Sequence, residues 1–155
     1  MLTVTPRFIA THIDDIPRDL QPLAQTSMTL ARILAGRGVR DAANLDTAFN
    51  KMLPANSLTG ITKAVALLDK AIDTQQKILI VGDFDCDGAT STALMVRVLR
   101  EMGAKVEFLV PDRFKYGYGL TPEIVVLGIE TYDPDVIVTV DNGISSHAGV
   151  ELAKA

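Results

Sequence analysis

The change of texture at residue 77 is the feature that most limits how this chain can fold. From there on, short apolar runs rich in β-branched residues alternate with segments of helical periodicity. Uniformly apolar runs are typical of parallel strands covered on both faces, and their alternation with helices is typical of βαβ units. The sequence therefore predicts an α/β fold, an open parallel sheet with a βαβαβ core and strands at about 78–82, 105–110 and 135–140.

Two helices are expected between these strands. The first, at about 89–102, is apolar nearly all round and ends at Gly103, a residue suited to a left-handed cap, so we expect a buried crossover helix. The second has a strong start signal, with Thr121 as N-cap, Pro122 at the first helical position and Glu123 near the positive end of the helix dipole. A further helix is expected to begin near Ser145.

Residues 1–76 are predicted to form a small helical region packed on this core. One helix is expected after a cap at Ser27 or Thr29, one after Asp41, and one from about Ile61 to Ile72. An extended arm is expected at 4–9. The apolar faces expected for the three helices are Leu30, Ile33 and Leu34; Leu45, Ala48 and Phe49; and Ile61, Val65, Leu68 and Ile72.

Composition narrows the class of protein. The chain is 48% hydrophobic, which suffices for a core, and its formal charge is -4, so no net positive field draws it to phosphate backbones. Any contact with nucleic acid must come from a local patch or from parts of the protein outside this sequence. The single cysteine, Cys86, excludes an internal disulfide, and no apolar run is long enough to cross a bilayer, so we expect a soluble, cytoplasmic protein without membrane contacts.

An acidic cluster follows the first predicted strand. Asp83, Asp85 and Asp87 stand within five residues and are followed by Gly88, which permits a sharp turn. Like charges this close repel one another unless a cation neutralises them, and hard oxygen ligands suit Mg²⁺ or Mn²⁺. The free amides of the next helix, with the hydroxyls of Thr90 and Ser91, could hold a phosphate oxygen.

A second carboxylate, Asp141, follows the third strand, in a turn with Asn142 and Gly143. Two acidic strand ends at one edge of a sheet indicate a binuclear metal site, in which two ions activate water and hold the attacking and leaving oxygens. For Asp141 to reach Asp85 and Asp87, the third strand must lie beside the first and the second on its other flank. The sequence thus predicts the strand order 2-1-3.

Other interpretations of the acidic cluster remain open. It matches the first half of a calcium-binding EF-hand loop, but the twelfth position holds Leu94 instead of glutamate. An aspartate at a strand end is also typical of phosphatases that form an aspartyl-phosphate, with Asp83 or Asp85 as nucleophile. The cluster could also be an acidic turn with helix caps, in a domain that serves only for docking or regulation.

The segment after the second strand concentrates basic and aromatic side chains. Arg113, Lys115, Tyr116 and Tyr118 could contact phosphates and stack on bases. The alternative is a glycine-rich turn whose basic residues are merely solvated.

Three segments, 81–94, 110–120 and 138–149, resemble the single-strand-specific exonucleases of the DHH phosphoesterase superfamily. The similarity covers nearly the whole chain. It implies that Asp83, Asp85, Asp87 and Asp141 bind metal, and that Asp85, Asp87 and Asp141 act in catalysis. The candidate substrate-binding residues are Thr90, Ser91, Arg113, Tyr118, Asn142 and Gly143.

The resemblance also implies a complete enzyme that holds two Mn²⁺ or Mg²⁺ ions and degrades single-stranded DNA from the 5′ end in recombination and repair. The family's Asp-His-His motif is absent from this sequence, and the two histidines, His12 and His147, do not form a pair. Residues 77–155 are therefore expected to be the first part of the phosphoesterase domain, truncated before that motif and inactive alone. We expect His147 to be solvated and Cys86 to be a small apolar filler.

Overall fold

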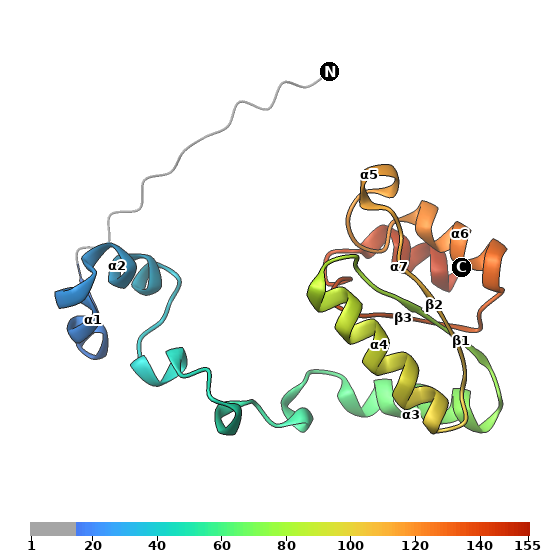
Figure 1. The fold of residues 1–155 in the computed structure, drawn as a ribbon, viewed down its shortest axis with the longest axis horizontal. Helices are drawn as coiled ribbons and strands as arrows, with labels where there is room; N and C mark the ends of the chain where they lie inside the picture. The colour runs from blue at the N-terminus through green and yellow to red at the C-terminus, as the bar shows by residue number, and fades with distance from the viewer. Residues whose placement is uncertain (1–14) are drawn as a thin grey trace, which may run out of the picture. The chain divides into compact units, whose positions relative to one another are not determined.

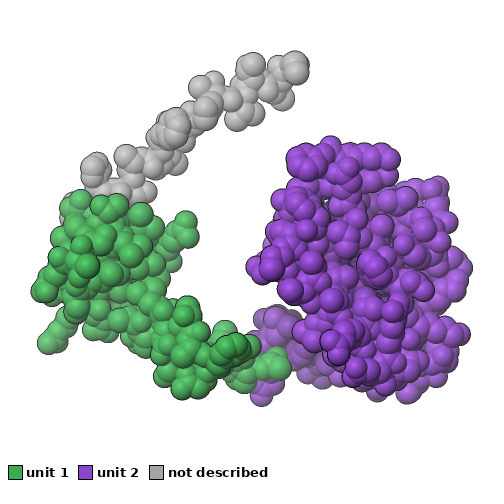
Figure 2. Space-filling model, viewed as in Figure 1, with its two compact units in different colours: residues 1–55 green, residues 56–155 purple. Residues whose placement is uncertain are grey.

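The computed structural model describes residues 15–155 (Figure 1). The chain divides into two compact units, Met1–Ala55 and Asn56–Ala155, which are coloured separately in Figure 2. The extended arm predicted at 4–9, and His12, lie outside the described residues. Within the described part, no helix has the length and apolarity needed to cross a membrane.

The second unit is built on a three-stranded parallel sheet. Its strands are β1 (Lys77–Val81), β2 (Lys105–Leu109) and β3 (Val136–Thr139), in the order β2-β1-β3. Central β1 pairs with both neighbours, so that Ile80 lies opposite Phe108 on one side and Val138 on the other. The α/β class, the parallel sheet and the strand order 2-1-3 predicted from the sequence are confirmed.

Helices follow each strand of the sheet. α4 (Cys86–Glu101) connects β1 to β2, a short α5 (Arg113–Tyr116) and α6 (Pro122–Tyr132) connect β2 to β3, and α7 (His147–Lys154) follows β3. The predicted start of α6 is confirmed, because the Thr121 hydroxyl accepts a hydrogen bond from the Ile124 amide at 3.4 Å and Pro122 stands in the first turn.

Side chains alternate along β1 and fill two hydrophobic cores. Ile78 and Ile80 face α4 and α3 (Ile61–Asp73), whereas Leu79 and Val81 face α6. All four are at most 1% exposed. Figure 1 shows the resulting layers, with α3 and α4 on one face of the sheet and α6 and α7 on the other. Burial on both faces explains why β1 is apolar from end to end.

The burial of α4 differs from the prediction. The helix begins at Cys86, three residues earlier than expected, and buries Thr92, Val96 and Leu99 on one side. Leu94 and Val98 on the other side are 63% and 42% exposed. The prediction of a helix buried all round was wrong, because within this unit a single layer of helices covers each face of the sheet.

The described part of the first unit contains the helices α1 (Gln21–Thr26) and α2 (Met28–Gly36). Ser27 caps α2 as predicted, with its hydroxyl accepting from the Leu30 amide at 3.4 Å. The buried residues of α2 are Ala31 and Ala35, however, and the predicted apolar face is half exposed at Leu30.

The second predicted helix is reduced to separate turns. Asp41 caps as expected, accepting from the Ala43 amide at 2.7 Å, but it starts only the 3₁₀ turn η2 (Ala42–Leu45). The Asp46 carboxylate then accepts from the Ala48 amide at 3.0 Å, which holds a turn where a helix would continue. Phe49 is 91% exposed, so the buried face predicted for it was wrong. The other single turns are η1 (Arg18–Leu20), η3 (Phe49–Lys51) and η4 (Ala55–Ser57).

The boundary between the two units lies before α3. Ala71 of α3 is fully buried in the core that Ile78 and Ile80 share with α4. This helix therefore belongs with the sheet, although the sequence pattern predicted it as part of a separate helical region at 1–76. The packing of the preceding region on the core stays a prediction.

Candidate metal centre

The end of β1 brings two carboxylates to the carboxyl edge of the sheet. After Gly82 the chain leaves the sheet, and Asp83 is buried, with 6% of its surface exposed. Asp85 is the N-cap of α4 and accepts a hydrogen bond from the Gly88 amide at 3.1 Å. A Cβ atom at Gly88 would overlap the backbone of Asp83. Glycine at this position therefore allows the first turn of α4 to close on the strand end.

The end of β3 brings a third carboxylate to the same edge. The Val140 amide donates to the Val81 carbonyl at 3.1 Å, and the Asn142 side-chain amide donates to the carbonyls of Val81 at 3.3 Å and Val140 at 3.0 Å. These bonds tie the two strand ends together. Asp141 between them has φ of +61°, a left-handed conformation that costs energy for a residue with a side chain.

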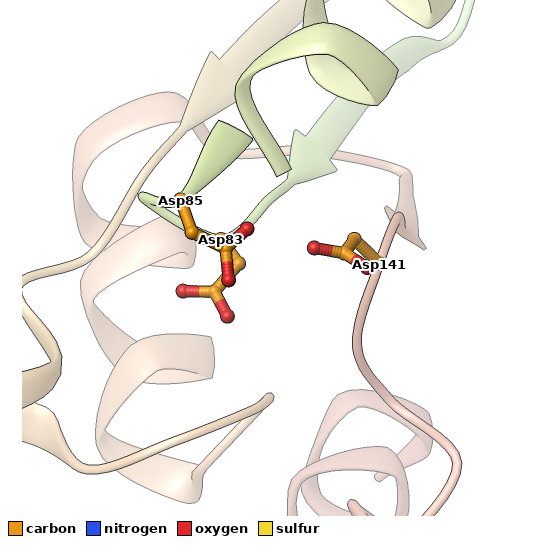
Figure 3. Close-up of side chains that lie close together, drawn as sticks. All are labelled: Asp83, Asp85 and Asp141. Carbon is orange, nitrogen blue, oxygen red and sulfur yellow. The ribbon is translucent and has the colours of Figure 1, made fainter. Parts of the chain in front are cut away.

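Figure 3 shows Asp83, Asp85 and Asp141 facing one another across the edge of the sheet, and one oxygen of each lies within 4.8 Å of the other two. Asp87 lies in the first turn of α4, outside this group of three. The structure thus brings together three of the four predicted ligands. Their service as metal ligands, and that of Asp87, stays a prediction.

The crowded carboxylates affect one another's protonation. The pKa of Asp141 is raised by desolvation and by the negative charges of Asp85, Asp87 and Asp83. Asp87 is therefore near enough to act on Asp141 electrostatically. A divalent cation would remove this repulsion, and a set of carboxylate oxygens is the donor chemistry that Mg²⁺ and Mn²⁺ prefer.

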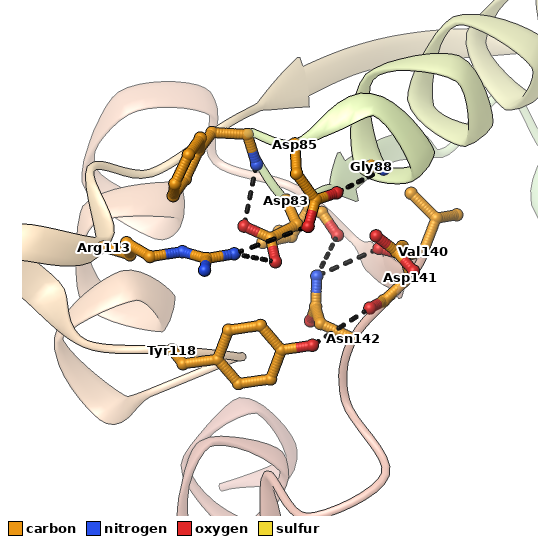
Figure 4. Close-up of polar contacts among 10 residues, drawn as sticks. Asp83, Asp85, Gly88, Arg113, Tyr118, Val140, Asp141 and Asn142 are labelled. Carbon is orange, nitrogen blue, oxygen red and sulfur yellow. Dashed lines mark hydrogen bonds and ion pairs between the residues drawn. The ribbon is translucent and has the colours of Figure 1, made fainter. Parts of the chain in front are cut away.

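Arg113, a predicted substrate-binding residue, contacts this cluster directly. One terminal nitrogen of its guanidinium donates to Asp83 at 2.5 Å and lies 3.8 Å from Asp85 (Figure 4). The hydrogen bond from Arg113 lowers the pKa of Asp83, against the opposing effect of burial. The carboxylate at the end of β1 is thus held ionised by a side chain from the segment after β2.

Aromatic side chains surround the guanidinium. Its central carbon lies 4.0 Å from the ring centre of Phe84 and 5.2 Å from that of Tyr118, and the ring of Phe114 lies 6.3 Å from that of Phe84. Phe84 is 48% exposed, Tyr118 60% and Phe114 92%. Sequence reasoning missed Phe84 and Phe114. The signal available in the sequence for Phe84 was a large apolar residue between two aspartates directly after a strand.

The Tyr118 hydroxyl donates to the Asp141 carbonyl at 3.3 Å, so this predicted residue lies at the site. The hydroxyls of Thr90 and Ser91 donate to carbonyls of their own helix, at 2.8 Å to Cys86 and 2.6 Å to Asp87. To donate to a phosphate they would have to leave these bonds.

The remaining predicted residues flank the site. Gly143 has φ of +111° and packs against Thr139, where a side chain would collide. His147 is exposed, as expected. Cys86 is also exposed, so its predicted role as an apolar filler was wrong, because it lies on the outer side of the first turn of α4.

Comparison with known proteins agrees with this geometry. Residues 77–155 match the family described as the DHH family, N-terminal domain. The single-stranded-DNA-specific exonuclease RecJ of Escherichia coli is 49% identical over 142 residues, an alignment that covers 91% of this chain and 23% of the relative. RecJ of Thermus thermophilus is 38% identical over 138 residues, covering 83% and 20%.

Solved structures match as well. An exonuclease RecJ bound to manganese has 40% identity and a TM-score of 0.58, covering 66% of this chain and 26% of that one. RecJ in complex with Mn²⁺ from Thermus thermophilus has 32% identity and a TM-score of 0.53, covering 87% and 18%. The chain spans 23% of the length of the first curated relative. With the family match over residues 77–155 and these relatives, the chain belongs to the DHH family.

Proposed function

We propose that this chain is the amino-terminal part of a metal-dependent exonuclease that degrades single-stranded DNA in the 5′ to 3′ direction during recombination and repair. The observation that carries the proposal is the convergence of Asp83, Asp85 and Asp141 at one sheet edge, beside exposed aromatic rings and a guanidinium. The similar proteins from Escherichia coli and Thermus thermophilus are single-stranded-DNA-specific exonucleases. A cytoplasmic location, on the ground of the lone cysteine, belongs to the same proposal.

Asp85, Asp87 and Asp141 would hold Mn²⁺ or Mg²⁺, with Asp83 completing the set. A pair of such ions supplies an activated water for in-line attack on phosphorus and stabilisation of the departing oxygen. The Asn142 amide, which donates to the carbonyls of Val81 and Val140, holds the two strand ends together. Exposed Phe84, Phe114 and Tyr118 offer faces on which unpaired bases can stack.

We further propose that the 155 residues alone do not hydrolyse DNA. Their sequence contains no Asp-His-His run, so carboxylates are the main ligands that they can offer. Metal binding by the isolated chain should accordingly be weak.

The test uses the full-length protein with Asp85→Ala, Asp141→Ala and the control Asp69→Asn, whose side chain is exposed on α3. Single-stranded DNA labelled at either end is digested with Mn²⁺. Loss of either strand-end carboxylate should lower the rate roughly 100-fold or more, with Asp69→Asn unchanged and label released first from the 5′ end. Near-normal digestion by Asp141→Ala would contradict the two-metal proposal, and covalent phosphate on Asp83 or Asp85 would favour an aspartyl-phosphate phosphatase. Initial release from the 3′ end would refute the polarity.

A further inference from the structure

Arg113 places a positive charge beside the crowded carboxylates at the sheet edge, where a metal ion would also place one. Its guanidinium donates to Asp83 and lies 3.8 Å from Asp85. These two residues belong to the group of three whose oxygens lie within 4.8 Å of one another. The same carboxylates therefore serve as partners of an arginine and as candidate ligands of a divalent cation.

A guanidinium and a divalent cation at these oxygens compete with each other. An oxygen lone pair that accepts a short hydrogen bond is not free for coordination, and two cations within a few ångströms of each other repel. Asp83 is only 6% exposed, so solvent screens this repulsion poorly there.

The contacts of Arg113 are those of a side chain that can be released. Only one terminal nitrogen reaches the carboxylates, and its Nε atom is buried without a hydrogen-bond partner among the described residues. The guanidinium also stacks on two rings, with its central carbon 4.0 Å from the ring centre of Phe84 and 5.2 Å from that of Tyr118. Such stacking tolerates sliding of the guanidinium in a way that a bidentate pair does not.

The backbone around Arg113 supports the same interpretation. Arg113 is the first residue of the four-residue helix α5, which lies between the cap residue Asp112 and Gly117 with φ of +80°. The far end of the segment is anchored where the Leu120 amide donates to the Ser146 hydroxyl at 2.9 Å. The side chain can thus leave the carboxylates while the segment stays attached to the domain.

We propose that Arg113 is the internal counter-ion of the metal-free site, and that binding of a divalent metal ion displaces its guanidinium from Asp83 and Asp85. This inference rests on the proposed function, because it assumes that these carboxylates bind metal. Arg113 then acts as a positioning residue. It holds the strand-end carboxylates in place in the metal-free protein, and it sets how tightly metal is held.

Thermodynamic linkage gives the sign of the effect. If Arg113 stabilises the metal-free state more than the metal-bound state, its removal destabilises the metal-free protein more than the metal-bound protein and tightens metal binding by that difference. A residue that stayed on Asp83 in both states would stabilise the metal-bound protein as well, so its removal would also lower the unfolding temperature with saturating Mn²⁺. The stability of the metal-bound protein, read together with the affinity, therefore separates the two roles.

The experiment compares wild type, Arg113→Gln and Arg113→Lys with Lys115→Gln in the full-length protein, without DNA. Lys115→Gln removes the same charge from the same short helix. It is a matched control because the Lys115 ammonium lies over Tyr116, 4.7 Å from the ring centre, and not on the Asp83 carboxylate. Mn²⁺ binding is titrated by electron paramagnetic resonance of the free ion. Thermal unfolding is measured with chelator and with saturating Mn²⁺.

We expect Arg113→Gln to bind Mn²⁺ roughly fivefold to tenfold more tightly than wild type, and Lys115→Gln to change the affinity much less. Arg113→Gln should lower the unfolding temperature in chelator, and most of that loss should vanish with saturating Mn²⁺. Arg113→Lys keeps the charge without the planar guanidinium and should lie between the two. It provides the comparison if Arg113→Gln does not fold.

Three outcomes would overturn the counter-ion role. These are an unchanged or weaker affinity in the Arg113 variants, an equal gain in Lys115→Gln, or an equal loss of stability with and without Mn²⁺. In each of them wild type still binds Mn²⁺ and the proposed function stands. If wild type binds no Mn²⁺ at all, the proposed metal site and the displacement of Arg113 both fall.

Discussion

The ends of β1 and β3 carry the same kind of side chain in opposite electrostatic settings. At the end of β1, Asp83 is buried and paired with Arg113, which lowers its pKa. At the end of β3, Asp141 is exposed, has a left-handed backbone and has a raised pKa. The fold compensates one carboxylate with a protein cation and leaves the other to be compensated from outside. This asymmetry is consistent with the cation site proposed above.

The largest effect should come from changing the close approach at the end of β1. Gly88→Ala would place a Cβ against the backbone of Asp83, so we expect a loss of about 3 kcal/mol in the free energy of unfolding. Replacing an ordinary glycine inside a helix with alanine stabilises the protein. A decrease in the free energy of unfolding would therefore indicate that the close contact at Gly88 matters.

Gly128→Ala in α6 is the matched control for this change. Its Cβ would meet the end of the Leu79 side chain, not a backbone group, so its loss should be clearly smaller. Urea unfolding of both variants measures the difference. Equal stability of Gly88→Ala and wild type would show that the strand end does not need this close contact.

The next effect is a difference in sign between the two strand ends in the metal-free protein. Asp83→Asn leaves Arg113 without its ionic partner and should cost about 1–2 kcal/mol, reduced because 32% of the Arg113 side chain is exposed. Asp141→Asn removes repulsion among the carboxylates and should hold or raise stability. Chemical unfolding in the presence of chelator tests this, and destabilisation of similar size by both substitutions would break the comparison.

The smallest effect should appear in the pH dependence of stability without metal. The lowered pKa of Asp83 contributes stability above its ordinary value of 3.8, and this is lost as pH falls through the folded-state pKa. The raised pKa of Asp141 has the opposite effect. Asp141 stays protonated to a higher pH in the folded state than in the unfolded state, so stability declines as pH rises above 3.8.

Unfolding free energies of wild type, Asp83→Asn and Asp141→Asn across this acidic range isolate the two contributions. Asp141→Asn should flatten the decline on the rising side, and Asp83→Asn should flatten the loss on the acidic side. Parallel curves for all three proteins would show that neither carboxylate has a shifted pKa in the folded state.

Several features of the fold were predictable from the sequence because they depend on neighbours a few residues away. Thr121 before Pro122 predicted the start of α6, and the uniformly apolar run of β1 predicted a strand covered on both faces. The placement of Asp85 and Asp141 at two strand ends also predicted the order β2-β1-β3, since parallel strands bring their carboxyl ends to one edge. The same local patterns misled where burial depends on the surroundings, as at Phe49 and along the outer side of α4.

By itself, then, the sequence determined the sheet, its strand order and the edge at which carboxylates gather, because periodicity, caps and strand ends are local signals. Tertiary structure alone decided that Arg113 pairs with Asp83, thirty residues away, that Asp87 stands outside the closest group, and that Phe84 and Phe114 flank the site. It also decided that α3 joins the sheet. The physical reason is that such contacts depend on side-chain torsions and on how separate segments pack together, and neither has a repeat or spacing along the chain.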